Sequence, residues 1–174
     1  MKLNILDNEQ KWQIEFNNGW LAHFRETGKS NFSVYNRPEN QTLVSGPGVD
    51  LKSSRLMLIS SAGVYLPETQ QPFDASNTLG DYSIRVLPSD ISFSKLSYAH
   101  EHYDHSAVLA DPQVLFPLAY LSEMVSEGQV GALTAVASFM GYQPDVSQVL
   151  DKTIPTIIKF AEDEMVDAAL LVPA

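Results

Sequence analysis

The stretch RLMLISSAG, residues 55–63, decides how the rest of the chain can be interpreted. Its first part contains an unbroken apolar run from Leu56 to Ile59. A strand that is apolar without alternation is typical of a parallel sheet with both faces buried. Small residues follow at once, up to Gly63, and they let a backbone turn sharply and approach a ligand closely. The stretch therefore predicts a buried parallel strand that ends in a tight turn.

Further predicted strands and helices alternate after this strand. Residues 83–88 and 166–172 predict strands. Residues 113–127 and 153–165 predict helices, and Thr153 is the expected cap of the second helix. Strands that alternate with helices indicate a parallel sheet covered by helices. We therefore expect an α/β fold, a three-layer sandwich with a mainly parallel sheet of the flavodoxin-like or Rossmann-like type.

The residues before this core fall into two parts. Aromatic side chains recur every four positions in the first part: Trp12, Phe16, Trp20 and Phe24. This spacing predicts an amphipathic helix that ends at Gly28 and packs its aromatic stripe in a core or against another subunit. The next part is polar and rich in turn-forming residues, which predicts a linker. We expect one domain over residues 1–174, made of the N-terminal helix (1–28), the linker (29–54) and the core (55–174).

Composition excludes several classes of function. The chain has 11 Lys and Arg against 21 Asp and Glu, a net charge of −10, which argues against a nucleic-acid partner. No apolar run reaches the ~20 residues of a membrane span, and the N-terminus lacks the apolar core of a signal peptide. We therefore expect a cytoplasmic protein without a membrane partner. Cysteine is absent, which excludes disulfides, thiolate metal ligands and a thiol nucleophile within these residues.

A histidine cluster is the first candidate for a catalytic site. Three of the four histidines, His100, His102 and His105, lie in six residues, with Asp104 between the last two. Such groups accept and release protons near neutral pH, and they also suit zinc or a similar divalent ion. They could equally form a polar loop that bonds to backbone carbonyls. We favour a catalytic role without a metal for His100, His102, Asp104 and His105.

Two further stretches are candidates for substrate binding. Ser60, Ser61 and Gly63 follow the first strand, where free backbone amides can hold a carboxylate or phosphate. A tight strand-to-loop turn explains the same residues equally well. Arg85 could clamp a substrate carboxylate through two hydrogen bonds, or it could pair with Asp81 inside the protein. The sequence leaves these alternatives open.

Five segments occur along the chain in a distinctive order: SSAGVYL, QPFD, GDYSIRVLP, AHEHYDHSAVLADPQVLFPLAYLSEMVSEGQVGAL and SFMGYQPD. This ordered series resembles the selenoprotein B family of the glycine, sarcosine and betaine reductases. The D-proline reductase selenoprotein subunit belongs to the same family. The resemblance covers roughly residues 55–174, and its specificity lies in the whole series rather than in any one segment.

The resemblance implies a cytoplasmic oxidoreductase subunit. In this family a selenocysteine, or a cysteine in relatives, attacks an amino acid or a derivative, and a dithiol that becomes a disulfide supplies the electrons. The nucleophile follows the strand that matches VDAALLVPA, residues 166–174. We therefore expect the reading frame to continue through a UGA codon after Ala174. The 174-residue form would then be inactive and its sheet incomplete at the C-terminus.

The resemblance also implies partners and roles. His100, His102, Asp104 and His105 would move protons or position the substrate, and Ser60, Ser61 and Gly63 would contact it. The expected partners are a small-molecule substrate, other reductase subunits or a thiol reductant, and a second copy of the chain; no cofactor is expected. Two alternatives remain: a cysteine-free binding or scaffold protein of the same fold, and a small metal-dependent hydrolase built on the histidines.

Overall fold

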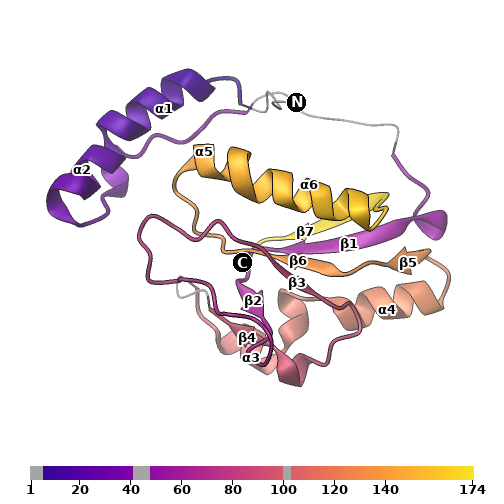
Figure 1. The fold of residues 1–174 in the computed structure, drawn as a ribbon. Coiled ribbons are helices and arrows are strands. Elements are labelled where there is room, and N and C mark those ends of the chain that lie inside the picture. Colours follow the sequence, from indigo (N-terminus) through magenta and orange to yellow (C-terminus); the bar gives the residue numbers. More distant parts are fainter. Residues whose placement is uncertain (1–5, 41–47, 100–102) are drawn as a thin grey trace.

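The computed structural model describes residues 6–40, 48–99 and 103–174 (Figure 1). Its centre is a five-stranded sheet. The strands are β1 (Arg55–Ser60), β3 (Arg85–Leu87), β5 (Ala132–Leu133), β6 (Val136–Ser138) and β7 (Ala168–Val172). β1 pairs in parallel with β7 on one side, and with β5 and then β6 on the other. β3 pairs antiparallel with β6. The predicted mainly parallel sheet is therefore confirmed.

Helices cover both faces of this sheet (Figure 1). α4 (Leu118–Ser126) lies on the face to which Leu56 and Leu58 of β1 point. α6 (Ile154–Asp163) lies on the opposite face, where Met57 and Ile59 point. Because β1 is apolar on both faces, it can be buried on both, which explains its unbroken apolar run. The result is the expected three-layer α/β sandwich.

Smaller elements surround the sandwich. Two strands, β2 (Val64–Tyr65) and β4 (Ser97–Tyr98), form a separate antiparallel pair. α3 (Ser106–Ala110) follows β4 along the chain, and α5 (Val146–Gln148) precedes α6. Short 3-10 turns occupy Phe32–Val34, Leu51–Ser53, Phe93–Lys95 and Pro112–Val114. None of the helices in the described residues is long and apolar enough to cross a bilayer.

The N-terminal helix is two helices. α1 (Glu9–Asn18) and α2 (Trp20–Thr27) meet at Gly19, where a Cβ atom would lie 2.8 Å from the carbonyl oxygen of Glu15. The predicted stop at Gly28 is confirmed, with φ at 67°. The aromatic stripe is a core, because Trp12, Phe16 and Trp20 are buried and stack in sequence. We refer to α1 and α2 together as the N-terminal hairpin.

The two predicted helix starts had different outcomes. α6 begins at Ile154 with Thr153 at its N-cap position, as predicted, although the Thr153 side chain makes no capping hydrogen bond. Helical residues also precede it: α5 begins at Val146, where the Asp145 side chain accepts a hydrogen bond from the N–H of Ser147. A π-helical turn, Val149–Thr153, joins α5 to α6 just before Pro155, whose missing N–H cannot continue an α-helical ladder. The earlier helix begins at Leu118 instead of residue 113, since Pro117 interrupts the pattern.

β7 is an exposed edge strand. Leu170 and Leu171 are 37% and 68% exposed, on opposite faces of the sheet, and β7 pairs only with β1 among the described strands. Parallel strands are ordinarily buried on both faces, so this edge is less covered than the rest of the sheet.

Candidate functional site

The carboxyl ends of β1, β6 and β7 meet at one edge of the sheet, which we call the carboxyl edge. In α/β sheets, ligands bind in crevices beside this edge. Ser60 and Ser61 lie at the end of β1, and Gly63 follows in the turn with φ at 64°. The structure therefore brings these three predicted substrate-binding residues together.

The turn uses most of its own hydrogen-bonding groups. The buried Ser60 hydroxyl donates to the carbonyl of Leu115 at 3.1 Å and accepts from the N–H of Ala62 at 3.3 Å. The Gly63 N–H donates to the Phe139 carbonyl at 2.9 Å. The N–H of Ser61 donates to the Val172 carbonyl at 3.2 Å. Because these amides already form hydrogen bonds within the protein, they are not free to bind an anion, and the turn contributes to the shape of the site instead.

The segment that carries His105 reaches the same turn. The Tyr103 hydroxyl donates to the carbonyl of Ala62 at 3.2 Å, and the ring of His105 lies 4.5 Å from the Tyr103 ring. The N–H of Ala99 donates to the Gly63 carbonyl at 3.0 Å, so the end of β4 is held there as well. His105 is therefore brought close to the carboxyl edge. His100 and His102 lie outside the described residues.

Asp104 has a local structural contact. Its carboxylate accepts hydrogen bonds from the N–H and the hydroxyl of Ser106, at 2.9 and 2.8 Å, in the first turn of α3. The backbone hydrogen bond from Ser106, followed by that of its hydroxyl and by the charge of His105, lowers the pKa of Asp104. Asp104 is thus an exposed carboxylate that orders the start of α3 beside His105.

A pocket of about 400 Å³ opens beside this edge, and we call it the His105 pocket. Its lining residues come from β2, β4, the loop before β3 and the start of α3: Tyr65, Pro72, Phe73, Asp74, Ala75, Ser76, Tyr98, Ala99 and His105. Pockets of this size and mixed lining suit small polar molecules. The arrangement can place an acid–base group, His105, against a bound ligand.

Tyr98 is a lining residue that the sequence did not indicate. Its hydroxyl is buried and has no hydrogen-bond partner among residues 6–40, 48–99 and 103–174. Burial raises the pKa of Tyr98 to about 12, so the hydroxyl keeps its proton and remains a donor at neutral pH. Tyr98 enters the pocket through the pairing of β4 with β2, a long-range contact without a local sequence signal.

Arg85 lies at the carboxyl edge, opposite Ser138 of β6. Its guanidinium donates to the carbonyls of Gln71 and Pro72 at 2.9 and 3.2 Å, and to the Ser83 hydroxyl at 2.8 Å. It also stacks over the Phe73 ring, 4.3 Å from the centroid. These contacts tie the loop of residues 66–82, one wall of the His105 pocket, to the sheet.

Asp81 anchors the other end of this loop. It accepts hydrogen bonds from the N–H groups of Asp74 and Ser83, at 2.9 and 2.8 Å, and from the Ser83 hydroxyl. Burial alone would raise the pKa of Asp81, but these hydrogen bonds and the charge of Arg85 outweigh burial and lower it. Arg85 and Asp81 therefore both hold this loop through Ser83 and backbone groups, and not through a direct ion pair with each other.

No group of three or more His, Cys, Asp or Glu side chains within the described ranges is placed to hold a metal ion. Of the predicted histidine cluster, only Asp104 and His105 belong to the described residues that this statement covers. The described part of the site is a pocket of mixed lining, with aromatic and apolar side chains, the His105 imidazole, the Asp74 carboxylate and the Ser76 hydroxyl.

An α/β sandwich with a small-molecule pocket beside the carboxyl ends of its parallel strands defines a class of ligand-binding α/β proteins. Within that class the chain belongs to the glycine/sarcosine/betaine reductase selenoprotein B family, whose model matches residues 28–173. The resemblance noted in the sequence is thereby confirmed. The N-terminal hairpin precedes the matched residues.

A relative supports the same assignment. The chain is 32% identical over 123 residues to the D-proline reductase subunit gamma of Acetoanaerobium sticklandii. The aligned residues make up 70% of this chain and 49% of the relative. The chain therefore spans about half the length of the curated relative that it matches. No solved structure matches the chain.

Proposed function

We propose that this chain forms the substrate-binding α/β part of a selenoprotein B-type reductase subunit that acts on an amino acid or a derivative. The observation that carries the proposal is the His105 pocket beside the carboxyl edge of a family member. The relative is a D-proline reductase subunit, which supports D-proline as one substrate to test and other subunits as partners.

The sulfur or selenium nucleophile comes from outside these 174 residues, because the chain contains no cysteine. A chalcogen of low pKa attacks a substrate carbon as its anion, so that a carbon–chalcogen bond forms while the carbon–nitrogen bond breaks and the nitrogen leaves with a proton. A dithiol then reduces this adduct with two electrons, which releases the reduced product and the chalcogen, and the dithiol becomes a disulfide. His105 moves a proton to or from the bound substrate, and Tyr98 forms part of the pocket wall. The 174-residue chain alone binds substrate without turning it over.

The first experiment compares the native reductase, purified with all its subunits, with the 174-residue chain alone. Oxidation of dithiothreitol is followed in the presence of D-proline, glycine, sarcosine or betaine. We expect turnover of at least one substrate by the native reductase and none by the chain alone. Turnover by the chain alone would refute the location of the nucleophile. Binding of all four compounds without turnover by either preparation would favour a scaffold protein instead.

The role of His105 is tested in the native reductase with His105→Gln. Loss of general acid–base catalysis typically costs 10²–10⁴-fold, so we expect kcat to fall by about a hundredfold. The pH profile of kcat should also lose one limb. If the role of His105 were purely structural, the profile would keep both limbs. His23→Gln, on α2, is the matched control and should leave kcat unchanged. Equal kcat values for the two variants would remove His105 from the mechanism.

A further inference from the structure

The His105 pocket contains a carboxylate that the proposed proton transfer does not use. Asp74 lines the pocket and is exposed to solvent. Its Oδ1 atom accepts the hydrogen bond from the Ser76 hydroxyl at 2.8 Å. Its Oδ2 atom forms no hydrogen bond or ion pair within residues 6–40, 48–99 and 103–174. The pocket therefore offers a ligand one carboxylate oxygen that the described chain leaves unpaired.

Neighbouring contacts hold the backbone of Asp74 in place. Its N–H donates to the Asp81 carboxylate at 2.9 Å, and its carbonyl accepts from the N–H of Asn77 at 3.2 Å. The preceding residue, Phe73, is buried and lies under the Arg85 guanidinium. Because this backbone is fixed before a ligand arrives, little conformational freedom is lost when the carboxylate forms an ion pair.

The charge of this carboxylate is not offset within the pocket. No lysine or arginine is among the lining residues in the described part of the chain. Arg85 is not a lining residue, and its guanidinium stacks over the Phe73 ring and donates to loop carbonyls. Asp74 therefore attracts a cationic group in the pocket and repels an anionic one.

Aromatic rings add to this preference. Tyr65 and Tyr98, which come from the paired strands β2 and β4, line the pocket and are half-buried. The faces of aromatic rings attract cations, because the ring quadrupole is negative there. A pocket lined by partly exposed tyrosine rings and one unpaired carboxylate thus suits a cationic nitrogen that is bonded to apolar carbons.

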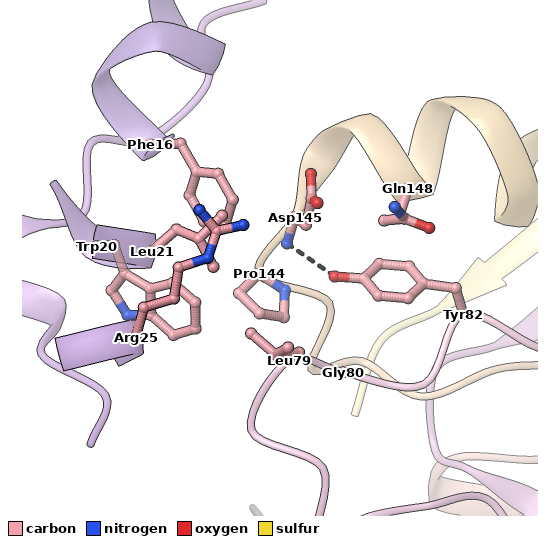
Figure 2. A pocket seen from close by; sticks show the side chains of 10 residues that line it. All are labelled: Phe16, Trp20, Leu21, Arg25, Leu79, Gly80, Tyr82, Pro144, Asp145 and Gln148. Carbon is pink, nitrogen blue, oxygen red and sulfur yellow. Dashed lines mark hydrogen bonds between the residues drawn. The ribbon is translucent and has the colours of Figure 1, made fainter. Parts of the chain in front are cut away.

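A second pocket, of about 270 Å³, differs in charge and lies where the N-terminal hairpin meets the sandwich (Figure 2). Arg25 of the hairpin belongs to one wall, and Asp145 belongs to the wall opposite. Its two charges therefore offset each other, and the N–H of Asp145 is already bonded to the Tyr82 hydroxyl, as Figure 2 shows. The described lining of the His105 pocket has no such opposing cation from Lys or Arg.

We propose that Asp74 is a specificity-determining residue of the His105 pocket, which recognises the cationic nitrogen of its ligand rather than the carboxylate. This inference rests on the proposed function, which assigns the pocket to an amino acid or a derivative. The ammonium group pairs with the Asp74 carboxylate, and the adjoining carbons lie against the tyrosine rings. An amide of the amino acid, which keeps the ammonium and lacks the carboxylate, therefore binds at least as tightly as the amino acid itself.

The test is an NMR titration of the 174-residue chain at neutral pH with ligands of similar shape and different charge. The cation is D-prolinamide and the zwitterion is D-proline, while cyclopentanecarboxamide and cyclopentanecarboxylate are the neutral compound and the anion. The imidazole signals of His105 report binding in this pocket. For a small ligand in an open pocket we expect D-prolinamide to bind with a Kd of ~1–10 mM. The neutral compound and the anion should bind at least about fivefold more weakly.

A charge-removing variant isolates the contribution of Asp74. Asp74→Asn keeps an oxygen that accepts from Ser76, and it should weaken D-prolinamide binding about fivefold. This difference should shrink as salt is added, because the contact is exposed. In the native reductase the same variant should raise KM about fivefold while kcat stays within about twofold. Glu68→Gln, an exposed carboxylate of the same loop outside the pocket lining, should leave Kd and KM unchanged.

Three results would overturn the proposal: no binding of D-prolinamide, equally tight binding of cyclopentanecarboxylate, or full affinity in Asp74→Asn. Any of them together with turnover by the native reductase refutes the role of Asp74 and leaves the reductase function intact. Selective binding of D-prolinamide without turnover by the native reductase refutes the reductase function and supports the charge preference of the pocket.

Discussion

At the scale of single residues, the carboxyl edge separates side chains that build the site from those that face a ligand. Three polar side chains form hydrogen bonds with backbone atoms of neighbouring segments: Ser60, Ser138 and Arg85. His105 and Tyr98 line the pocket instead. Buried polar groups must be paired, so the fold uses most of the small polar residues here, and the aromatic and imidazole groups remain for chemistry.

Ser138 provides a test of the building role. Its hydroxyl accepts the hydrogen bond from the buried N–H of Val64 at 2.8 Å, which joins β6 to the start of β2. Ser138→Ala leaves that N–H unpaired, and the free energy of unfolding should fall by about 1–3 kcal/mol. Urea unfolding measures the change. Ser126→Ala, at an exposed hydroxyl, should change the free energy by less than about 0.5 kcal/mol. Equal effects would show that the Val64 contact is unimportant.

Asp81 predicts a pH dependence of stability. Its pKa is lowered in the folded protein, so its contribution is fully present above the unfolded pKa, ~3.9. The contribution is lost as the pH falls through the lower folded pKa. At pH 6 the urea midpoint of wild type should therefore exceed that of Asp81→Asn, and this difference should shrink as the pH falls to 3. Asp90→Asn, at an exposed position, serves as the control. A constant difference between wild type and Asp81→Asn across this range would contradict the prediction.

At the scale of elements, the loop of residues 66–82 and the edge strand β7 contrast with the buried β1. The loop is anchored by Arg85 at one point and by Asp81 at another, and its middle, residues 72–76, lines the His105 pocket. Long loops in compact domains are usually functional when they are ordered in this way. β7 has no comparable cover on its outer side within the described chain.

β7 predicts the behaviour of the chain in solution. An exposed apolar edge strand favours pairing with another chain, so the predicted homo-oligomer should form through this edge. Leu171→Lys should weaken concentration-dependent association while changing the free energy of unfolding by less than about 0.5 kcal/mol, because Leu171 is 68% exposed. Sedimentation velocity over a range of concentrations measures association. Ile14→Lys, at a 62% exposed residue of α1, is the control. Association of both variants like wild type would place the contact elsewhere.

At the scale of the whole molecule, the N-terminal hairpin and the sandwich are two packed units. The aromatic core of the hairpin packs against Val146 of α5, and Tyr35 bonds to the Pro144 carbonyl. The hairpin lies beside the amino end of α5 in Figure 1. These contacts join the hairpin to the sandwich.

Both tryptophans of the chain lie in the hairpin, so tryptophan emission reports on the hairpin alone. Far-UV circular dichroism reports on all helices and strands. We expect the two signals to give the same urea midpoint, because the hairpin core shares buried contacts with the sandwich. Tyr35→Phe removes the hydrogen bond to Pro144, so it should lower the urea midpoint of tryptophan emission more than that of circular dichroism. A separate early emission transition in the wild-type chain would show that the hairpin unfolds independently.

The sequence by itself determined the class of fold and the family. The apolar run of residues 56–59 predicts a strand buried on both faces, and the terminal strand and the aromatic core follow from the same local patterns. The structure agrees at β1, at β7 and at Trp12, Phe16 and Trp20. Local periodicity is enough for these features, because they depend on which residues must leave water.

Only the tertiary structure decided which residues share a site. Tyr98 reaches the His105 pocket through β2, and the hairpin meets the sandwich where Tyr35 donates to the Pro144 carbonyl. The helical residues that precede α6 likewise depend on the Asp145 cap of α5 and on the π-helical turn before Pro155. These outcomes follow from contacts between segments far apart in the chain, and no local pattern of apolar residues records which segments will meet.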